Sequence, residues 1–177
     1  IRGAMAGEDA DVVLVSGGTS VGQEDHAPRL LSELGELAYH GISMRPSSPT
    51  GIGRIGERFV FLLPGNPVSC LAAYEFFAGP TIRALGGRAR AWPHRRVTLP
   101  LARKIVSEVG RTDYVRVAIE NGEAIPLATA GASILSSTVR AAGAVVVARE
   151  LEGMPEGTPI EILLYDEDPA DVGSGVS

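Results

Sequence analysis

Two short apolar runs constrain the fold of this chain more than any other feature of its sequence. Asp11–Ser16 (DVVLVS) and Phe59–Leu63 (FVFLL) consist almost entirely of valine, leucine and phenylalanine, without alternating polar residues. Such runs are typical of strands that are buried on both faces, as in a parallel sheet covered by helices. Leu37–Met44 adds a third strand candidate.

Helical segments follow the first and last of these strands, as parallel strands require. Ala27–Leu34 has Pro28 in its first turn and Gly35 at its end, and these are common helix boundaries. A longer helix is expected over about 68–85, and Gly79-Pro80 should kink it or divide it in two. Its apolar residues form one stripe at helical spacing: Leu71, Tyr74, Ala78, Ile82 and Leu85.

Three strands and two or three helices are too few to cover both faces of a doubly wound sheet. We therefore predict that residues 1–92 are part of an α/β domain with an incomplete, mostly parallel sheet. The remainder should lie upstream of Ile1 or be supplied by a partner.

The second half of the chain, residues 93–166, is predicted to be a small all-β barrel domain. Its apolar segments are short, rich in β-branched residues and separated by turn signals such as Glu120–Glu123 (ENGE), a pattern typical of barrels and sandwiches. One brief helix candidate, Ile134–Ala142, interrupts them, and residues 167–177 form an acidic tail expected to be disordered. The strand candidates are Arg96–Leu101, Tyr114–Ile119, Ala124–Ala128, Ala144–Arg149 and Pro159–Tyr165.

Composition limits the classes of partner. The chain has 177 residues and a formal net charge of -5, so the basic footprint of a nucleic-acid-binding protein is absent. Its single cysteine, Cys70, excludes an internal disulfide framework, suits a reducing compartment and is interpreted as a buried small side chain. No run reaches the ~18 apolar residues of a membrane span, and no signal peptide is visible. A cytoplasmic protein with a small-molecule ligand is expected.

The loop Ser16–Asp25 (SGGTSVGQED) leaves a strand and enters a helix, which is where open α/β sheets place their ligands. Gly17 and Gly18 let the backbone approach a ligand, and successive amides can form an anion-binding nest. The loop has no lysine, and Glu24 and Asp25 would repel a phosphate unless a divalent cation stood between them. A carboxylate here can hold a metal or act as a general base; alternatively, both acids merely favour the start of the following helix.

A second loop, Leu63–Ser69 (LPGNPVS), also joins a strand to a helix. Its two prolines stiffen the turn around Gly65 and direct the amides of the helix start outward. Asn66 or Ser69 can cap that helix, so a cap without a ligand is the alternative to a binding site. The backbones around Gly18 and Gly65 are expected to open side by side at one sheet edge. Arg45 is expected at the same edge, where it either grips an oxyanion through paired hydrogen bonds or is an ordinary surface residue.

Two other features are rejected as sites. Gly51–Gly56 (GIGRIG) matches the dinucleotide fingerprint, but the strand Glu57–Leu63 follows it, whereas the fingerprint needs a helix N-terminus for the pyrophosphate. We expect a hairpin or loop there. The three histidines, His26, His40 and His94, lack metal-ligand spacing.

Three loops taken together resemble those of the molybdopterin molybdenumtransferase family, which includes the E domain of gephyrin. Ser16–Asp25, Met44–Pro49 (MRPSSP) and Leu63–Ser69 match in order and spacing. The second half resembles the C-terminal barrel of that family at Gly110–Tyr114 (GRTDY) and Gly131–Ser137 (GASILSS). The resemblance covers roughly residues 1–165.

The resemblance implies the last common step of molybdenum cofactor assembly, in which molybdate is inserted into the dithiolene of adenylylated molybdopterin and AMP is released. A divalent cation, Mg²⁺ or another, is required, and Asp25 matches a functional aspartate implied to act in catalysis and to hold the metal. Arg45 stands where the family typically has lysine, and Ser48 replaces a second basic residue. The implied binding residues, including prolines beside the pterin and serines of the oxyanion pocket, are Gly17, Gly18, Thr19, Ser20, Gly22, Arg45, Pro64, Gly65, Asn66, Pro67 and Ser69.

The resemblance also implies limits and alternatives. The family's α/β domain begins with a segment of Thr-Gly-Asp-Glu type after two further domains, so these 177 residues are expected to be catalytically incomplete alone. Family members are commonly dimers, and a homo-oligomer is expected. One alternative is a molybdopterin adenylyltransferase of the preceding step, which resembles the α/β domain alone. The other is a non-enzymatic pterin-binding or scaffold module, as in the receptor-clustering role of gephyrin.

Overall fold

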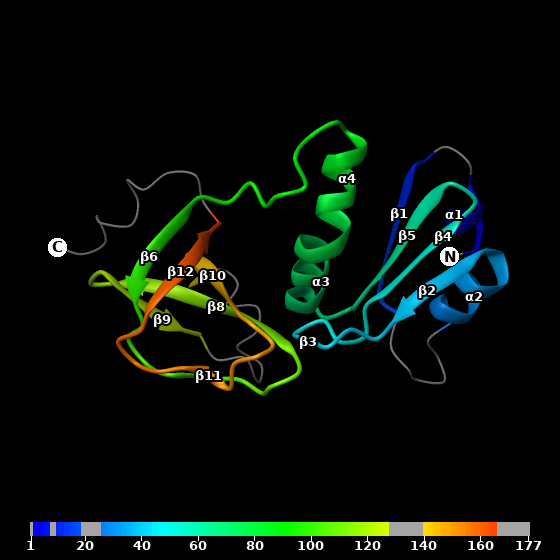
Figure 1. Ribbon diagram of the computed structural model, residues 1–177. Coiled ribbons are helices and arrows are strands. Elements are labelled where there is room, and N and C mark those ends of the chain that lie inside the picture. Colours follow the sequence, from blue (N-terminus) through cyan, green and yellow to red (C-terminus); the bar gives the residue numbers. More distant parts are fainter. Residues whose placement is uncertain (1, 8–9, 19–25, 128–139, 166–177) are drawn as a thin grey trace. The chain divides into compact units, whose positions relative to one another are not determined.

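The structure is a computed structural model that describes residues 2–7, 10–18, 26–127 and 140–165 (Figure 1). The chain divides into two compact units at Trp92–Pro93. Within the described part of the chain, no helix is both long enough and apolar enough to cross a membrane.

A four-stranded sheet forms the centre of the first unit (Figure 1). β1 and β5 run parallel, whereas β5–β4 and β4–β2 are antiparallel pairs. The α/β class is confirmed. The described sheet is mixed rather than mostly parallel, because Gly51–Gly56, rejected above as a dinucleotide fingerprint, forms β4 and the start of the turn in an antiparallel β4–β5 hairpin. The strands lie in the order β1 (Val12–Ser16), β5 (Arg58–Leu63), β4 (Gly51–Ile55) and β2 (Glu36–His40).

Helices cover both faces of β5, which explains its unbroken apolar sequence. Val60 and Leu62 pack against the first two helices, whereas Phe61 and Leu63 pack against the third helix and the turn after it. Successive side chains of a strand point to opposite faces, so a strand between two helical layers needs an apolar residue at every position. The helical segments are α1 (Arg2–Ala6), α2 (Ala27–Leu34), α3 (Pro67–Ala73), the π-helical turn η1 (Tyr74–Ala78) and α4 (Gly79–Leu85).

β1 has a similar sequence but less cover. Val13 and Val15 pack beside the α1–α2 core, whereas Leu14 on the opposite face keeps 43% of its surface exposed. The prediction that this strand is buried on both faces is therefore wrong for the described chain, because β1 is the edge of the described sheet and pairs with β5 on one side.

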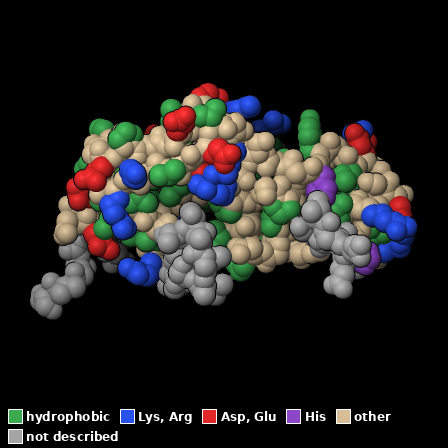
Figure 2. All heavy atoms as spheres, turned by 90° about the horizontal axis from the view of Figure 1, so that it is seen from below, with side chains coloured by type: hydrophobic (Ala, Val, Ile, Leu, Met, Phe, Trp, Pro, Cys, Tyr) green, Lys and Arg blue, Asp and Glu red, His purple; other side chains and the backbone are tan. Residues whose placement is uncertain are grey.

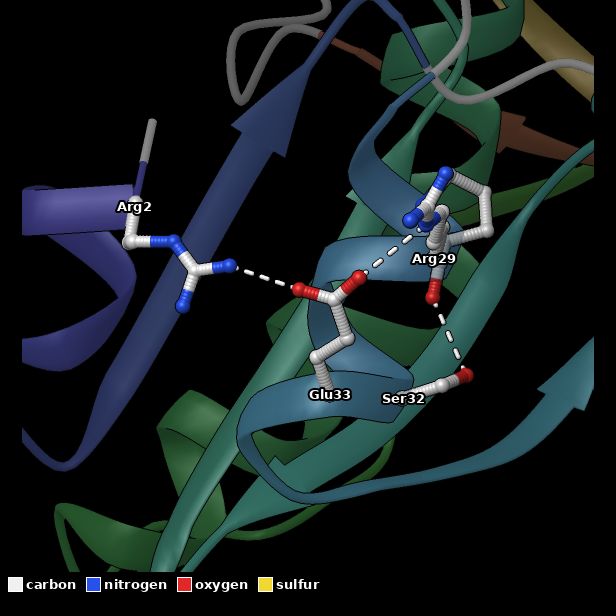
Figure 3. A network of polar contacts seen from close by, with 5 residues as sticks. Arg2, Arg29, Ser32 and Glu33 are labelled. Carbon is white, nitrogen blue, oxygen red and sulfur yellow. Dashed lines mark hydrogen bonds and ion pairs between the residues drawn. The ribbon is translucent and has the colours of Figure 1, made fainter.

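An exposed polar network joins α1 to α2 (Figure 3). The carboxylate of Glu33 accepts hydrogen bonds from Arg2 Nη2 at 2.6 Å and from Arg29 Nε at 3.0 Å, and Ser32 Oγ donates to Pro28 O at 3.1 Å. The hydrogen bond from Arg29, and then that from Arg2, lowers the pKa of Glu33 below its ordinary value of 4.5. Exposed ion pairs of this kind stabilise a fold only slightly.

The long helix is divided, as its Gly79-Pro80 pair predicts, but a π-helical turn lies directly before the glycine. The expected apolar stripe is only partly correct. Leu71 and Leu85 are each 52% exposed, whereas Ala72, Ala73 and Ala78 are fully buried. Small side chains let the helix approach the sheet closely, and the wider π turn shifts which residues face it.

The second unit is a β structure, and its described residues form a hydrophobic core from its own strands and connections. β9–β8–β10–β12–β6 are successive antiparallel neighbours, and a bridge between Leu101 and Ala124 brings the two ends of this path together. The hairpin turn between β8 and β9 has Asn121 at φ 52° and Gly122 at φ 78°, as a type I′ turn requires. The strands are β6 (Arg96–Pro100), β8 (Thr112–Glu120), β9 (Glu123–Pro126), β10 (Gly143–Val147) and β12 (Pro159–Leu164).

All five strands predicted for this unit are confirmed, with ends shifted by a few residues. The ribbon of β7 (Ile105–Val106) and β11 (Gly153–Met154) was not predicted, because two residues carry no usable periodicity. The helix candidate Ile134–Ala142 lies mostly outside the described residues, and the proposed tail lies entirely outside them.

Basic and acidic side chains are interspersed on the face shown in Figure 2.

Candidate functional site

The carboxyl ends of β1 and β5 bring the two candidate loops together. Ser16 and Leu63 are paired at the last position of the parallel ladder, and Gly17 N donates to Leu63 O at 3.1 Å. A Cβ atom built on Gly65 would lie 3.3 Å from Gly17 Cα. The expectation that both loops begin side by side at one sheet edge is therefore confirmed.

Gly17 and Gly18 both require glycine-like backbone conformations, with φ of 84° and 63°. These left-handed angles are costly for residues with a side chain. Gly18 O accepts a hydrogen bond from Ala27 N at 3.3 Å, so Gly18 lies beside the first residue of α2. Gly18 is exposed.

Thr19, Ser20, Gly22 and Asp25 lie outside the described residues. Their roles as binding residues, and that of Asp25 in catalysis and metal binding, stay predictions. Among the residues that the structure does describe, no group of three His, Cys, Asp or Glu side chains is placed to hold a metal ion.

The loop after β5 is a capped helix start. Asn66 Oδ1 accepts hydrogen bonds from Val68 N at 3.1 Å and from Ser69 N at 3.4 Å. Asn66, rather than Ser69, is therefore the cap. Pro64 is buried, whereas Gly65, Asn66 and Pro67 are exposed. A cap fixes the orientation of this turn without hiding its surface, so the cap and a binding role are compatible.

The segment with Arg45 also reaches this sheet edge. It leaves β2 after His40 and enters β4 at Gly51, which is paired with Leu62 near the end of β5. The predicted strand Leu37–Met44 ends early at His40 because Gly41 adopts φ 91°. Arg45 belongs instead to the two-residue strand β3 (Met44–Arg45) and is half-buried.

Ser47 ties this segment to the loop after β5. Its hydroxyl donates a hydrogen bond to Ser69 O at 2.6 Å, so the Met44–Pro49 and Leu63–Ser69 segments are in direct contact. The sequence gives no signal for this role, because a serine between prolines is an ordinary loop residue. Arg45, Pro64, Gly65, Asn66, Pro67 and Ser69 are thus brought to one edge of the sheet with Gly17 and Gly18.

Cys70 lies beside the end of β1. It packs at the margin of the Phe61–Leu63 core and is partly rather than fully buried. Its Sγ is 3.6 Å from Ser16 Oγ. The interpretation as a small packing residue fits this position, although the thiol also contacts the first residue of the candidate loop.

Two family models match the chain, and both concern molybdenum cofactor biosynthesis. Residues 1–84 match a model described as a probable molybdopterin binding domain. Residues 98–165 match a model described as the MoeA C-terminal region, domain IV. The two matches together include both units of the structure.

Similar proteins carry related names. A putative molybdopterin biosynthesis protein of Methanocaldococcus jannaschii is 33% identical over 93% of this chain and 38% of its own length. A molybdopterin molybdenumtransferase of Staphylococcus aureus is 26% identical over 93% of this chain and 40% of its own length. The chain therefore spans about two fifths of the curated relatives it matches.

Solved structures show the same fold. A molybdopterin biosynthesis MoeA protein of Pyrococcus horikoshii is 33% identical and has a TM-score of 0.73, covering 89% of this chain and 38% of that one. A molybdenum cofactor biosynthesis protein of Pyrococcus furiosus has a TM-score of 0.69 at 28% identity, covering 89% of this chain and 50% of that one.

Proposed function

The chain belongs to the molybdopterin molybdenumtransferase family, and from this premise we propose that it binds molybdopterin at the edge of the sheet where β1 and β5 end. The observation that carries the proposal is the contact between the Gly17 and Gly65 backbones. Both loops leave the carboxyl ends of neighbouring parallel strands, which is where ligands of α/β sheets bind.

We propose that the reaction, carried out as part of a longer polypeptide, is the insertion of molybdate into adenylylated molybdopterin with release of AMP. Backbone amides around Gly18 and Gly65 would bind oxyanions, and Arg45 would supply the positive charge that the glycine-rich loop lacks. The side chains of Thr19, Ser20 and Ser69 would add hydroxyl groups. A small anionic pterin fits a site that combines exposed backbone with few charges.

Asp25 is proposed to hold a divalent cation, Mg²⁺ or another. A cation held there by one carboxylate would take its remaining ligands from substrate oxygens and water. Mg²⁺ is commonly bound in this way at phosphate-containing sites. Bound there, the cation would neutralise phosphate charge and polarise a phosphoryl oxygen.

The match of residues 98–165 to the MoeA C-terminal region favours the transferase over a molybdopterin adenylyltransferase of the preceding step. We further propose that the partners are small molecules rather than nucleic acid or membrane. A homodimer in the cytoplasm is the proposed setting of the protein.

The decisive experiment uses the full-length polypeptide and its Asp25→Ala variant. We expect the wild-type protein to bind molybdopterin and to convert adenylylated molybdopterin and molybdate to the cofactor with release of AMP. The variant should keep its fold but support no maturation of a molybdoenzyme. Normal molybdoenzyme activity of the variant would remove Asp25 from the mechanism, and formation of adenylylated product from ATP and molybdopterin would indicate the preceding step instead.

A further inference from the structure

Ser47 has an unusual backbone conformation for its residue type. Its φ is 95°, in the left-handed region that residues with a side chain rarely adopt. Among the described residues, the other non-glycine residue with positive φ is Asn121, which lies in a hairpin turn where asparagine is common. Ser47 instead precedes the two central residues of a turn closed by the hydrogen bond from Thr50 N to its carbonyl oxygen, a position that does not require positive φ, and only 3% of its surface is exposed.

The polar groups of Ser47 make contacts in two directions. Its carbonyl oxygen accepts from Thr50 Oγ1 at 2.7 Å and from Thr50 N at 3.1 Å, and Thr50 is fully buried. Its hydroxyl donates to Ser69 O at 2.6 Å in the other loop. Ser69 N in turn donates to the capping Asn66. A continuous series of hydrogen bonds therefore runs from Thr50 to the Asn66 cap.

The segment from 41 to 50 is also closed at its base. Gly41 N donates to Thr50 O at 3.0 Å, and Ile42 N donates to Ser48 O at 2.8 Å. These bonds make the segment a compact loop whose position relative to its neighbour depends on contacts between the two. The hydroxyl of Ser47 provides such a contact, two residues after Arg45 and one before Ser48.

We infer that Ser47 is a positioning residue, which holds the loop bearing Arg45 at a fixed distance from the Asn66 loop so that both meet the same anionic ligand. This inference rests on the proposed function. A purely structural role predicts that stability and binding change together, whereas a positioning role predicts that they separate. Two substitutions separate them, because alanine keeps the strained Cβ and loses the hydroxyl, while glycine relieves the strain and also loses the hydroxyl.

The first test needs no ligand. Hydrogen exchange of the 41–50 and 66–70 backbone amides is compared in the wild-type chain, the Ser47→Ala variant and the control Ser43→Ala, which alters an exposed serine of the same segment. We expect exchange in both loops to become about tenfold faster in Ser47→Ala and to stay unchanged in the control. Unchanged exchange in Ser47→Ala would show that the hydroxyl holds nothing in place.

The second test measures equilibrium binding of molybdopterin to the full chain. Ser47→Ala and Ser47→Gly should each weaken binding about five- to tenfold, the range expected for one net hydrogen bond. The Tm of Ser47→Gly should stay within a few degrees of wild type, since strain relief offsets the lost bond. If Ser47 acts through Arg45, Arg45→Gln and Ser47→Ala should be non-additive, so that the double variant binds no more weakly than Arg45→Gln.

Additive effects, or wild-type affinity in both Ser47 variants, would overturn the positioning role while leaving the proposed function intact. Failure of the wild-type chain to bind molybdopterin would instead count against the proposed function. In that case the exchange measurement alone decides whether Ser47 joins the two loops.

Discussion

β1 and β5 are adjacent parallel strands with similar sequences, yet they occupy different environments. β5 lies between two helical layers, and four consecutive residues of it are buried, whereas β1 leaves Leu14 43% exposed at the edge of the described sheet. An unbroken apolar run therefore reports that a strand is suited to burial on both faces. It does not show whether helices of the described chain pack on both of those faces.

The loops that follow the two strands differ as well. The loop after β1 needs left-handed backbone at Gly17 and Gly18, whereas the loop after β5 needs space at Gly65 and a side-chain cap from Asn66. One candidate binding loop is thus constrained by conformation and the other by packing. Substitutions in the two strands and in the two loops test these differences.

Phe61→Ala should destabilise the first unit by about 3–5 kcal/mol, because it leaves a cavity between β5 and the third helix. Leu14→Ala, its matched edge variant, should lower the free energy of unfolding by roughly 1 kcal/mol or less. Urea unfolding followed by fluorescence measures both, since the only tryptophan is Trp92, whose Nε1 donates to Glu75 O at 2.6 Å within this unit. Equal losses would mean that Leu14 is as well covered as Phe61.

Gly17→Ala should cost about 1–2 kcal/mol, because its φ of 84° is unfavourable for alanine. An added Cβ there meets nothing within 4 Å, so the cost is conformational. Gly65→Ala should cost less, roughly 1 kcal/mol, since its Cβ needs only a small shift of the neighbouring backbone. Both should weaken molybdopterin binding. A larger loss of stability in Gly65→Ala would reverse the assignment of the two constraints.

Glu33→Gln should change the free energy of unfolding least, and its effect on the pH dependence should be confined to acid pH. Arg29 and Arg2 lower the pKa of Glu33 in the folded state. Its ion pairs therefore stabilise the α1–α2 layer fully at pH values above the ordinary pKa of a glutamate, and this stabilisation is lost as the pH falls through the folded-state pKa. Between about pH 5 and pH 3, wild-type stability should decline slightly more steeply than that of the variant. Glu57→Gln, at an exposed turn, is the control, and ~1 M salt should reduce the difference.

Much of the fold was predictable because it depends on local patterns. The apolar runs, the proline and glycine boundaries of Ala27–Leu34 and the β-branched segments of the second unit each fixed an element near its observed position. The meeting of the loops also followed, because parallel neighbours end at the same edge. These features depend on periodicity and on turn chemistry, which a single sequence displays.

Other features depend on tertiary contacts that no local pattern reveals. The π turn before Gly79 and the exposure of Leu71 arise from how the helix packs against its neighbours. Ser47 was missed for the same reason, since its importance comes from Ser69, twenty-two positions away. The predictions for Asp25 remain predictions, because it lies outside the described residues.

The close approach of Gly17 and Gly65 has an evolutionary consequence. A side chain at position 65 would be directed at the Gly17 backbone, whereas one at position 17 would meet open space, so the backbone path at 17 decides which residues fit at 65. Tolerated replacements should therefore be correlated across a mutant library, and the two loops should diversify as one unit rather than as two independent segments.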